Sequence, residues 1–123
     1  MDLTPYFKSV LDQDRAPVVL CDLNHTVRYM NPAAGERYAR QGGMALVGTS
    51  LLGCHSPKAN EMIERVVEWF GADRRNNLIY TSRNDKENKD VYMVALRDEG
   101  GALIGYYEKH EYRDRETRKR YDF

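Results

Sequence analysis

The sequence has no excess charge of either sign and no long apolar run. Lysine and arginine together number 19, as do aspartate and glutamate, so the formal net charge at pH 7 is zero. No global field draws such a chain to nucleic acid or to anionic lipid, which argues against DNA binding by bulk charge. No stretch is apolar enough to span a bilayer, and no signal-peptide pattern follows Met1. We therefore expect a cytoplasmic protein that binds neither nucleic acid nor membrane.

Residues that commonly serve catalysis or metal binding are few and scattered. The two cysteines, Cys21 and Cys54, are too far apart to form a Cys-x-x-Cys pair, and we expect both to be reduced thiols. The three histidines, His25, His55 and His110, show no His-x-x-x-His spacing, and there is no glycine-rich phosphate loop. The sequence therefore predicts a protein that is not an enzyme. A thiol-based activity at an exposed Cys54 is the remaining enzymatic alternative.

A strand, a turn, a second strand and a helix start follow one another near the N-terminus. The residues of Val18–Cys21 and Thr26–Met30 favour β structure, and the turn Asp22–Asn24 between them predicts a hairpin. Asn31 is a good helix cap, and Pro32 needs no hydrogen-bond donor in the first turn. A helix should therefore begin there, continue through Tyr38 and Ala39, and end at the pair Gly42–Gly43.

The second half reads as one helix followed by three strands. Ser56 as cap and Pro57 at the first position start a helix that Gly71 can close. Its apolar residues recur at helical spacing: Ala59, Met62, Ile63, Val66, Val67 and Phe70. The expected strands are Leu78–Thr81, Val91–Leu96 and Ala102–Tyr107, with a polar linker at Asn84–Asp90. These elements predict an α+β fold with a five-stranded antiparallel sheet and helices packed on one face.

The 123 residues suffice for one domain with a helix before it and a charged tail behind it. We expect an amphipathic helix in residues 1–15, the domain itself in residues 16–112, and a tail in residues 113–123. The apolar stripe of the first helix consists of Leu3, Phe7, Val10 and Leu11. This narrow stripe suits packing on the sheet or on a second subunit. The tail is expected to be a solvated helix or a frayed end, or alternatively a signalling helix or a basic partner contact.

The order of strand, turn, strand and Asn-capped helix resembles the opening of the PAS superfamily of sensory domains. The segment Leu46–Leu52 is similar to the glycine-containing segment that precedes the long helix of these domains. Cys54–Lys58 is similar to a Cys-His-Pro-Pro-Lys signature of one PAS subgroup, often attached to hemerythrin-like domains, with Ser56 in place of the first proline. The resemblance covers roughly residues 16–112 and implies a sensory domain that signals through a homodimer or another partner.

The resemblance places His55 and Cys54 beside a ligand cavity between the long helix and the sheet. The positive end of a helix dipole stabilises the thiolate form of a cysteine just before the helix N-terminus, and it stabilises the neutral form of a histidine at the same place. His55 is therefore a candidate metal ligand, and haem is the first cofactor candidate. The alternative is that His55 bonds to the local turn and Cys54 is a small buried apolar residue. Flavin is less favoured, because Leu51 occupies the position of the reactive cysteine of light-sensing PAS domains.

Aromatic and sulfur-containing side chains are numerous in the expected strands, and alternation should turn about half of them inward. An inward tyrosine needs a polar partner, which a ligand could supply, whereas an outward one suits a dimer interface. A core filled by these rings without any ligand is the third possibility. The candidate cofactor-binding residues are His55, Cys54, Tyr29, Asn31, Tyr80, Tyr92 and Tyr106.

Two functions of different classes follow. The first is a sensor that binds a small ligand or haem and signals to an unidentified downstream protein. The second is a ligand-free module for protein interaction and dimerisation, which would use the first helix and the outer face of the sheet. The sequence does not identify the ligand.

Overall fold

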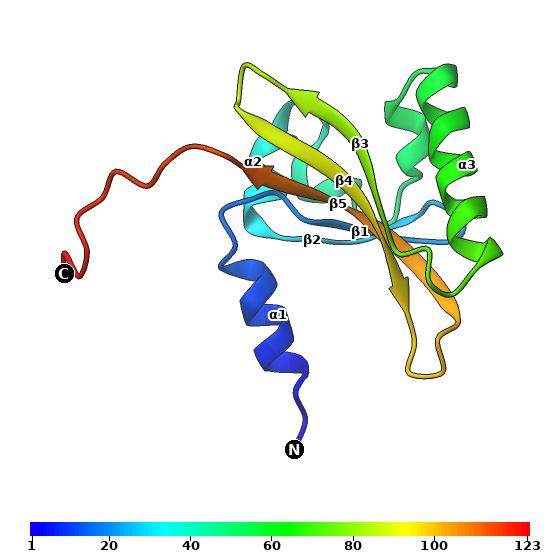
Figure 1. Ribbon diagram of the computed structural model, residues 1–123, viewed down its shortest axis with the longest axis horizontal. Helices are drawn as coiled ribbons and strands as arrows, with labels where there is room; N and C mark the ends of the chain where they lie inside the picture. Colours follow the sequence, from blue (N-terminus) through cyan, green and yellow to red (C-terminus); the bar gives the residue numbers. More distant parts are fainter.

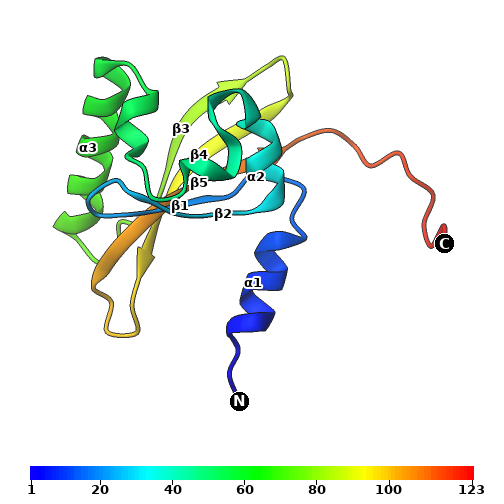
Figure 2. The ribbon, with the colours of Figure 1, turned by 180° about the vertical axis from the view of Figure 1, so that it is seen from behind.

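A computed structural model describes residues 1–123 and shows one five-stranded antiparallel sheet. The elements along the chain are α1 (Thr4–Asp12), β1 (Val19–Asp22), β2 (Val27–Met30), α2 (Pro32–Arg37), the short 3-10 helices η1 (Ala39–Gln41), η2 (Gly43–Leu46) and η3 (Leu51–Cys54), α3 (Pro57–Ala72), β3 (Leu78–Asn84), β4 (Lys89–Arg97) and β5 (Leu103–Tyr112). The strands lie in the order β2-β1-β5-β4-β3. The helices from α2 to α3 lie over one face of the sheet, which confirms the predicted α+β architecture (Figures 1 and 2).

The N-terminal hairpin and the helix start after it are confirmed. β1 and β2 pair with Val19 opposite Met30, and Asn31 Oδ1 accepts the Ala34 N–H at 2.9 Å as the cap of α2. The expected length of α2 is wrong, because the helix ends at Arg37 and is followed by η1. The chain there tightens into i to i+3 bonds, such as Gln41 N–H to the Tyr38 carbonyl at 3.0 Å.

The long helix agrees with its prediction within one residue. Ser56 Oγ accepts the Ala59 N–H at 3.2 Å, and the helix runs to Ala72. Its buried residues, Val66 and Phe70, contact the core under the sheet. The cap and the apolar spacing therefore fix both the start of α3 and the face that it buries.

The polar segment expected as a linker is instead a tight β-hairpin turn. β3 extends to Asn84 and β4 begins at Lys89, so the strands are longer than predicted. Asn84 Oδ1 accepts the Glu87 N–H at 2.9 Å, and Asn88 adopts a left-handed φ of 50°. Asparagine tolerates that conformation, which closes the turn. β5 likewise continues to Tyr112, five residues beyond the predicted end, because its polar half pairs with the start of β4.

The core lies between the sheet and the helices α2 and α3. Its buried members are Cys21, Val27, Met30, Ala34, Val66, Phe70, Met93 and Tyr106. β1 and β5 approach closely at Gly105, where a Cβ atom would collide with the Cys21 carbonyl. A glycine is needed there for β5 to take its place in the middle of the sheet.

A charged network joins α2 to the turn between β3 and β4. The Arg37 guanidinium donates to both carboxylate oxygens of Glu87, at 2.7 and 3.0 Å. Lys89 Nζ lies 3.3 Å from the same carboxylate, although the Lys89 side chain is only 1% exposed. The hydrogen bonds from Arg37 are the main reason that the pKa of Glu87 falls to about 2. Glu87 is therefore the counter-ion of a buried ammonium group.

Both ends of the chain lie away from the sheet. α1 projects from the body of the molecule and buries none of its residues (Figures 1 and 2). Residues 113–123 are exposed and form no helix, so the structure has the frayed end, not the solvated helix, of the two forms expected for the tail. None of the helices has the length and apolar character needed to cross a membrane.

Candidate functional site

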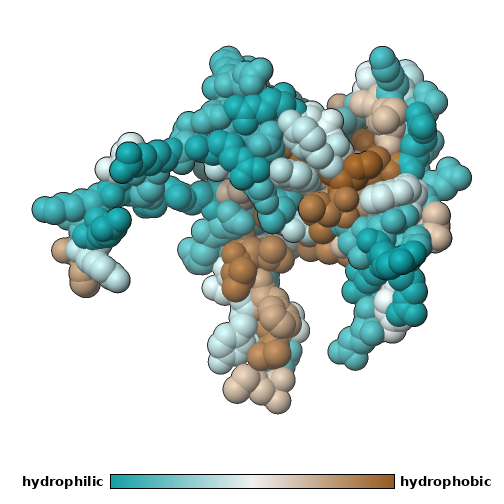
Figure 3. All heavy atoms as spheres, viewed as in Figure 1, coloured by the Kyte–Doolittle hydropathy of each residue, from teal (hydrophilic) through white to brown (hydrophobic).

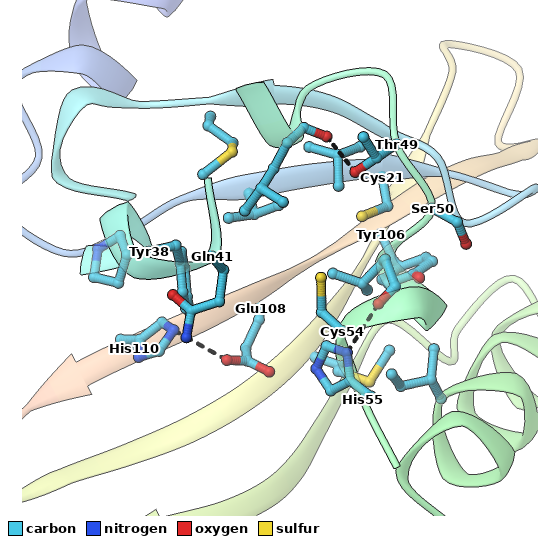
Figure 4. A pocket seen from close by; sticks show the side chains of 18 residues that line it. Cys21, Tyr38, Gln41, Thr49, Ser50, Cys54, His55, Tyr106, Glu108 and His110 are labelled. Carbon is cyan, nitrogen blue, oxygen red and sulfur yellow. Dashed lines mark hydrogen bonds and ion pairs between the residues drawn. The ribbon is translucent and has the colours of Figure 1, made fainter. Parts of the chain in front are cut away.

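A cavity of about 170 Å³ lies between the helix-covered face of the sheet and the segment from η3 to α3 (Figure 4). Its walls are mostly apolar, with residues from β1, β2, η2, η3, α3 and β4. The apolar side chains include Val19, Val27, Met30, Leu46, Leu51, Ile63 and Met93. Its polar groups come from Cys21, Tyr38, Gln41, Thr49, Ser50, Cys54, His55, Tyr106, Glu108 and His110. A cavity of about 150 Å³ can hold a benzene-sized molecule, so this one has room for a single substituted ring.

The polar groups on the sheet side come from alternate residues of β5. Tyr106, Glu108 and His110 all face the helices, opposite Ala95, Met93 and Val91 of β4. Such positions on a covered sheet face normally carry apolar side chains. The Glu108 side chain is nevertheless 49% exposed, because it borders the open cavity. This strand therefore presents a carboxylate to the open cavity.

Glu108 is held by its neighbour on the same strand face. His110 Nε2 lies 3.1 Å from Glu108 Oε1, and the His110 side chain is 4% exposed. Burial alone would raise the pKa of Glu108, but the hydrogen bond with His110 and the charges of His110, His55 and Lys89 outweigh it and lower the pKa. Glu108 is therefore an ionised carboxylate at neutral pH. His110 Nδ1 is buried and has no hydrogen-bond partner.

His55 and Cys54 lie at the opposite side of the cavity, in the connection between η3 and α3. His55 Nδ1 is 2.9 Å from the Leu51 carbonyl, so Nδ1 carries a proton and donates this bond, and Nε2 has no partner within the protein. Figure 4 shows Glu108 between His110 on one side and the Cys54–His55 pair on the other. Both His55 and Cys54 are exposed at this edge. The expected hydrogen bond of His55 to the local turn is present, whereas Cys54 is not the buried residue of the alternative reading.

The inner end of the cavity contains neutral groups. The Tyr106 hydroxyl shares a hydrogen bond of 2.8 Å with His25 Nδ1, and burial raises the pKa of Tyr106. Burial also raises the pKa of the Cys21 thiol to about 11. Both groups therefore stay protonated at neutral pH. The sequence spacing had separated the two cysteines, but Cys21 and Cys54 line the same cavity.

The structure does not bring the other candidate residues to this cavity. Tyr29 donates its hydroxyl hydrogen bond to Asp12 of α1. Tyr80 and Tyr92 pair across β3 and β4 on the outer face, with ring centroids 5.4 Å apart. Asn31 is fully buried, and its amide bonds only to backbone groups of this chain. Of the strand tyrosines proposed for ligand contact, Tyr106 alone lines the cavity.

Sequence reasoning missed Glu108 and His110. Their signal was the alternation of Tyr106, Glu108 and His110, which continues the period of two beyond the predicted strand end. The polar composition of that stretch resembles a loop, so the strand was ended at Tyr107.

The cavity does not fit a haem group, which was the first cofactor candidate. Sites for drug-sized molecules have volumes of about 300–1,000 Å³, and a haem is larger than most such molecules. The cavity measures about 170 Å³. His55 Nε2 has no partner within the protein, but a cavity of this volume does not hold the macrocycle. The same volume argues against a flavin, and no three His, Cys, Asp or Glu side chains are placed to hold a metal ion.

A second exposed feature lies on α1 and the outer face of the sheet. Phe7 and Val10 of α1 are 62% and 70% exposed, and Leu78 and Tyr80 of β3 are also exposed. Figure 3 shows apolar side chains along α1 and a further apolar patch where β3 and β4 pass beside α3. The helix has no partner within the chain for its apolar stripe.

No protein-family model and no curated protein matches the chain. Solved structures do match its fold. The PAS domain of a protein from Colwellia psychrerythraea is 14% identical with a TM-score of 0.65, and the match covers 89% of this chain and 96% of that one. The PAS domain of BvgS from Bordetella pertussis is 16% identical with a TM-score of 0.59, covering 94% and 89% of the two chains.

A third match is the Aer2 receptor of Vibrio cholerae, a dual PAS-haem oxygen sensor. It is 18% identical with a TM-score of 0.54, and the match covers 76% of this chain and 90% of that one. Identities this low establish the fold alone. That fold is the one shared by PAS domains.

Proposed function

We propose that this chain, which has the fold of PAS domains, is a sensory domain that binds a small molecule in the cavity between β5 and the η3–α3 segment. Ligand binding would change its contacts with a partner protein, and the domain would carry out no reaction itself. The observation that carries the proposal is Glu108, an ionised side chain on the covered face of the sheet that borders a mostly apolar cavity. The similarity of the fold to an oxygen-sensing receptor supports a sensory role.

A charged group is unusual on the covered face of a sheet, where apolar side chains are the norm. The Glu108 side chain is about half exposed, and His110 pairs with only one of its two oxygens, so the other oxygen is open to whatever fills the cavity. A ligand that uses the carboxylate gives this arrangement a function, because small-molecule sites combine apolar walls with a few polar groups.

The path from the cavity to a partner follows β5. Glu108 faces the cavity, whereas Tyr107 and Lys109 beside it face outward. The strand then leads to Arg113, which donates to Asp90 at 2.9 Å at the start of the tail. A shift of β5 on ligand binding would therefore reach the outer face of the sheet and the tail.

The segment Cys54–Lys58 supports assignment to the PAS subgroup with the Cys-His-Pro-Pro-Lys signature.

Native mass spectrometry of freshly expressed protein, with an absorbance scan of the same sample, tests the proposal. Wild-type protein should carry a small extra mass without a Soret band. Leu51→Trp, which fills the cavity from η3, should lose that mass, while the control Leu52→Trp, whose position does not line the cavity, should keep it. A Soret band would restore haem as the ligand. Extra mass retained by Leu51→Trp would place the ligand elsewhere and contradict the proposal.

The second candidate function is a ligand-free dimerisation module. The observation in its favour is the unpartnered stripe of α1, with Phe7 and Val10 more than half exposed. Apolar side chains exposed together on one helix commonly mark a protein interface. The apolar patch beside β3 and β4 offers a surface for the same stripe of a second copy.

Sedimentation velocity separates this function from the first. Phe7→Asp should convert a dimer to a monomer, because it buries a charge in the interface. The control Ser9→Asp adds the same charge at an exposed polar position of α1 and should leave the dimer intact. A bare dimer without extra mass would favour the module. A wild-type monomer would exclude it.

A further inference from the structure

The cavity carries a chemical preference that follows from the negative charge of Glu108 and from the oxygen of its carboxylate that His110 does not bind. We infer that it accepts a molecule about the size of a single substituted ring that presents a cationic or N–H donor group to Glu108. This inference rests on the proposed ligand-binding function. It names the charge and the size of the ligand, which the fold alone does not.

The first step concerns Glu108. Its Oε1 lies 3.1 Å from His110 Nε2, whereas Oε2 has no hydrogen-bond partner within the protein. A carboxylate oxygen can only accept hydrogen bonds. Because the Glu108 side chain is about half exposed, this oxygen is free to contact water in the empty cavity. A ligand that reaches it and displaces that water must therefore bring a donor, since the carboxylate oxygen would otherwise lose its hydrogen bonds.

The second step concerns the other polar groups that a ligand would meet. The Cys21 thiol and the Tyr106 hydroxyl are protonated and therefore neutral, and Tyr106 already shares its hydroxyl with His25. His55 Nδ1 donates to the Leu51 carbonyl, which leaves Nε2 open to a ligand, and His110 Nδ1 has no partner either. No lysine or arginine side chain lines the cavity. Apart from the two histidines, Glu108 is thus the one ionisable side chain of the lining that is charged at neutral pH, so an anionic ligand would meet its negative charge with no lysine or arginine in the lining to offset it.

The third step concerns size and position. The apolar walls include Val27, Leu51 and Ile63, and the volume of about 170 Å³ suits one ring with a short substituent. Glu108 comes from β5 on the sheet side, and these walls come from β2, η3 and α3 around it. A ring between the apolar walls would direct a one-carbon amino substituent toward the carboxylate. Charge-assisted hydrogen bonds of this kind are about twice as strong as neutral ones.

The test uses three probes that share one ring and differ only in the polar group: benzylamine, benzyl alcohol and sodium benzoate. Isothermal titration calorimetry at pH 7 should rank their affinities in that order, with benzylamine at least about tenfold tighter than benzoate. Glu108→Gln keeps the size of the side chain and removes its charge. It should weaken benzylamine by about tenfold and leave benzyl alcohol within about twofold.

A matched control lies on the same strand. Glu111→Gln removes a carboxylate from the outer face of β5, where it pairs with Lys109 and Arg113, and should change none of the three affinities. Benzoate binding as tightly as benzylamine would overturn the inference while leaving the ligand-binding function in place. Binding of none of the probes would also overturn the inference, and the ligand-binding function would then stand or fall with the extra mass of the wild-type protein and its loss in Leu51→Trp. If Glu108→Gln does not fold, the ranking on the wild-type protein still decides the question.

Discussion

Replacement of Asn31 by alanine should destabilise the fold more than most single substitutions. The side chain is fully buried, and its Oδ1 accepts the N–H groups of both Val18 and Ala34 at 2.9 Å. Its Nδ2 donates to the carbonyls of Leu11 and Ala16, also at 2.9 Å. One amide thus connects the end of α1, the start of β1 and the first turn of α2.

The magnitude follows from the groups that are left without partners. Loss of the cap alone costs about 1 kcal/mol, and each buried backbone group left unpaired costs about 1–3 kcal/mol. Water can reach the carbonyls near α1 more easily than the two buried N–H groups, so we expect a loss of about 3 kcal/mol for Asn31→Ala. This is a large part of the ~5–15 kcal/mol that stabilises a typical domain.

Urea unfolding followed by circular dichroism measures this loss. Asn24→Ala is the control, because Asn24 is exposed in the β1–β2 turn, and its effect should stay within about 0.5 kcal/mol. Asn31→Asp keeps the acceptor for the two N–H groups but places a carboxylate oxygen against the Leu11 and Ala16 carbonyls. It should therefore retain the cap and loosen α1, seen as faster amide exchange there. A loss below about 1 kcal/mol for Asn31→Ala, or weaker ligand binding at unchanged stability, would refute this structural role.

Two further substitutions test the packing and the charged network. Phe70→Ala should cost about 4 kcal/mol in urea unfolding, because Phe70 is fully buried in the core, whereas Met62→Ala on the exposed side of the same helix should cost less than about 1 kcal/mol. Glu87→Gln should cost about 2 kcal/mol at pH 7, because it leaves the buried Lys89 ammonium without its counter-ion. The pKa of Glu87 is lowered from 4.5 to about 2 on folding, so its stabilisation is present above pH 4.5 and is lost as the pH falls toward 2. Other carboxylates with a lowered pKa, such as Glu108, remain in the variant. Unfolding curves between pH 7 and pH 2.5 should therefore show a steeper acid-dependent loss of stability in the wild type than in Glu87→Gln, and equal slopes would contradict this account.

Short-range signals are what made the fold predictable. Asn31-Pro32 and Ser56-Pro57 each specify a helix start from two adjacent residues, and both caps form the expected bonds. The hairpin follows equally from the turn at Asp22–Asn24 and its two flanks. Signals of this kind depend on the local backbone, so they need no knowledge of distant partners.

The site was less predictable because it depends on strand pairing. Which face Tyr80 and Tyr92 occupy is set by the register between β3 and β4, and that register shifts between Tyr80 and Ser82. Glu108 and His110 looked like loop residues because polar side chains rarely occupy a covered sheet face. Their place in a strand comes from pairing with β4, and the alternation of Tyr106, Glu108 and His110 does not by itself specify that pairing. The cavity itself is the space left between elements far apart in the sequence, so its volume could not be read from composition.

The most direct test of ligand binding in this cavity uses the methionine methyl groups. Met30 and Met93 are buried and line the cavity, whereas Met62 is exposed on α3 and does not line the cavity. In protein labelled with ¹³C at the methionine methyls, titration with benzylamine should shift the resonances of Met30 and Met93 in a saturable manner and leave that of Met62 in place. Unchanged resonances of Met30 and Met93, or a shift confined to Met62, would contradict the account.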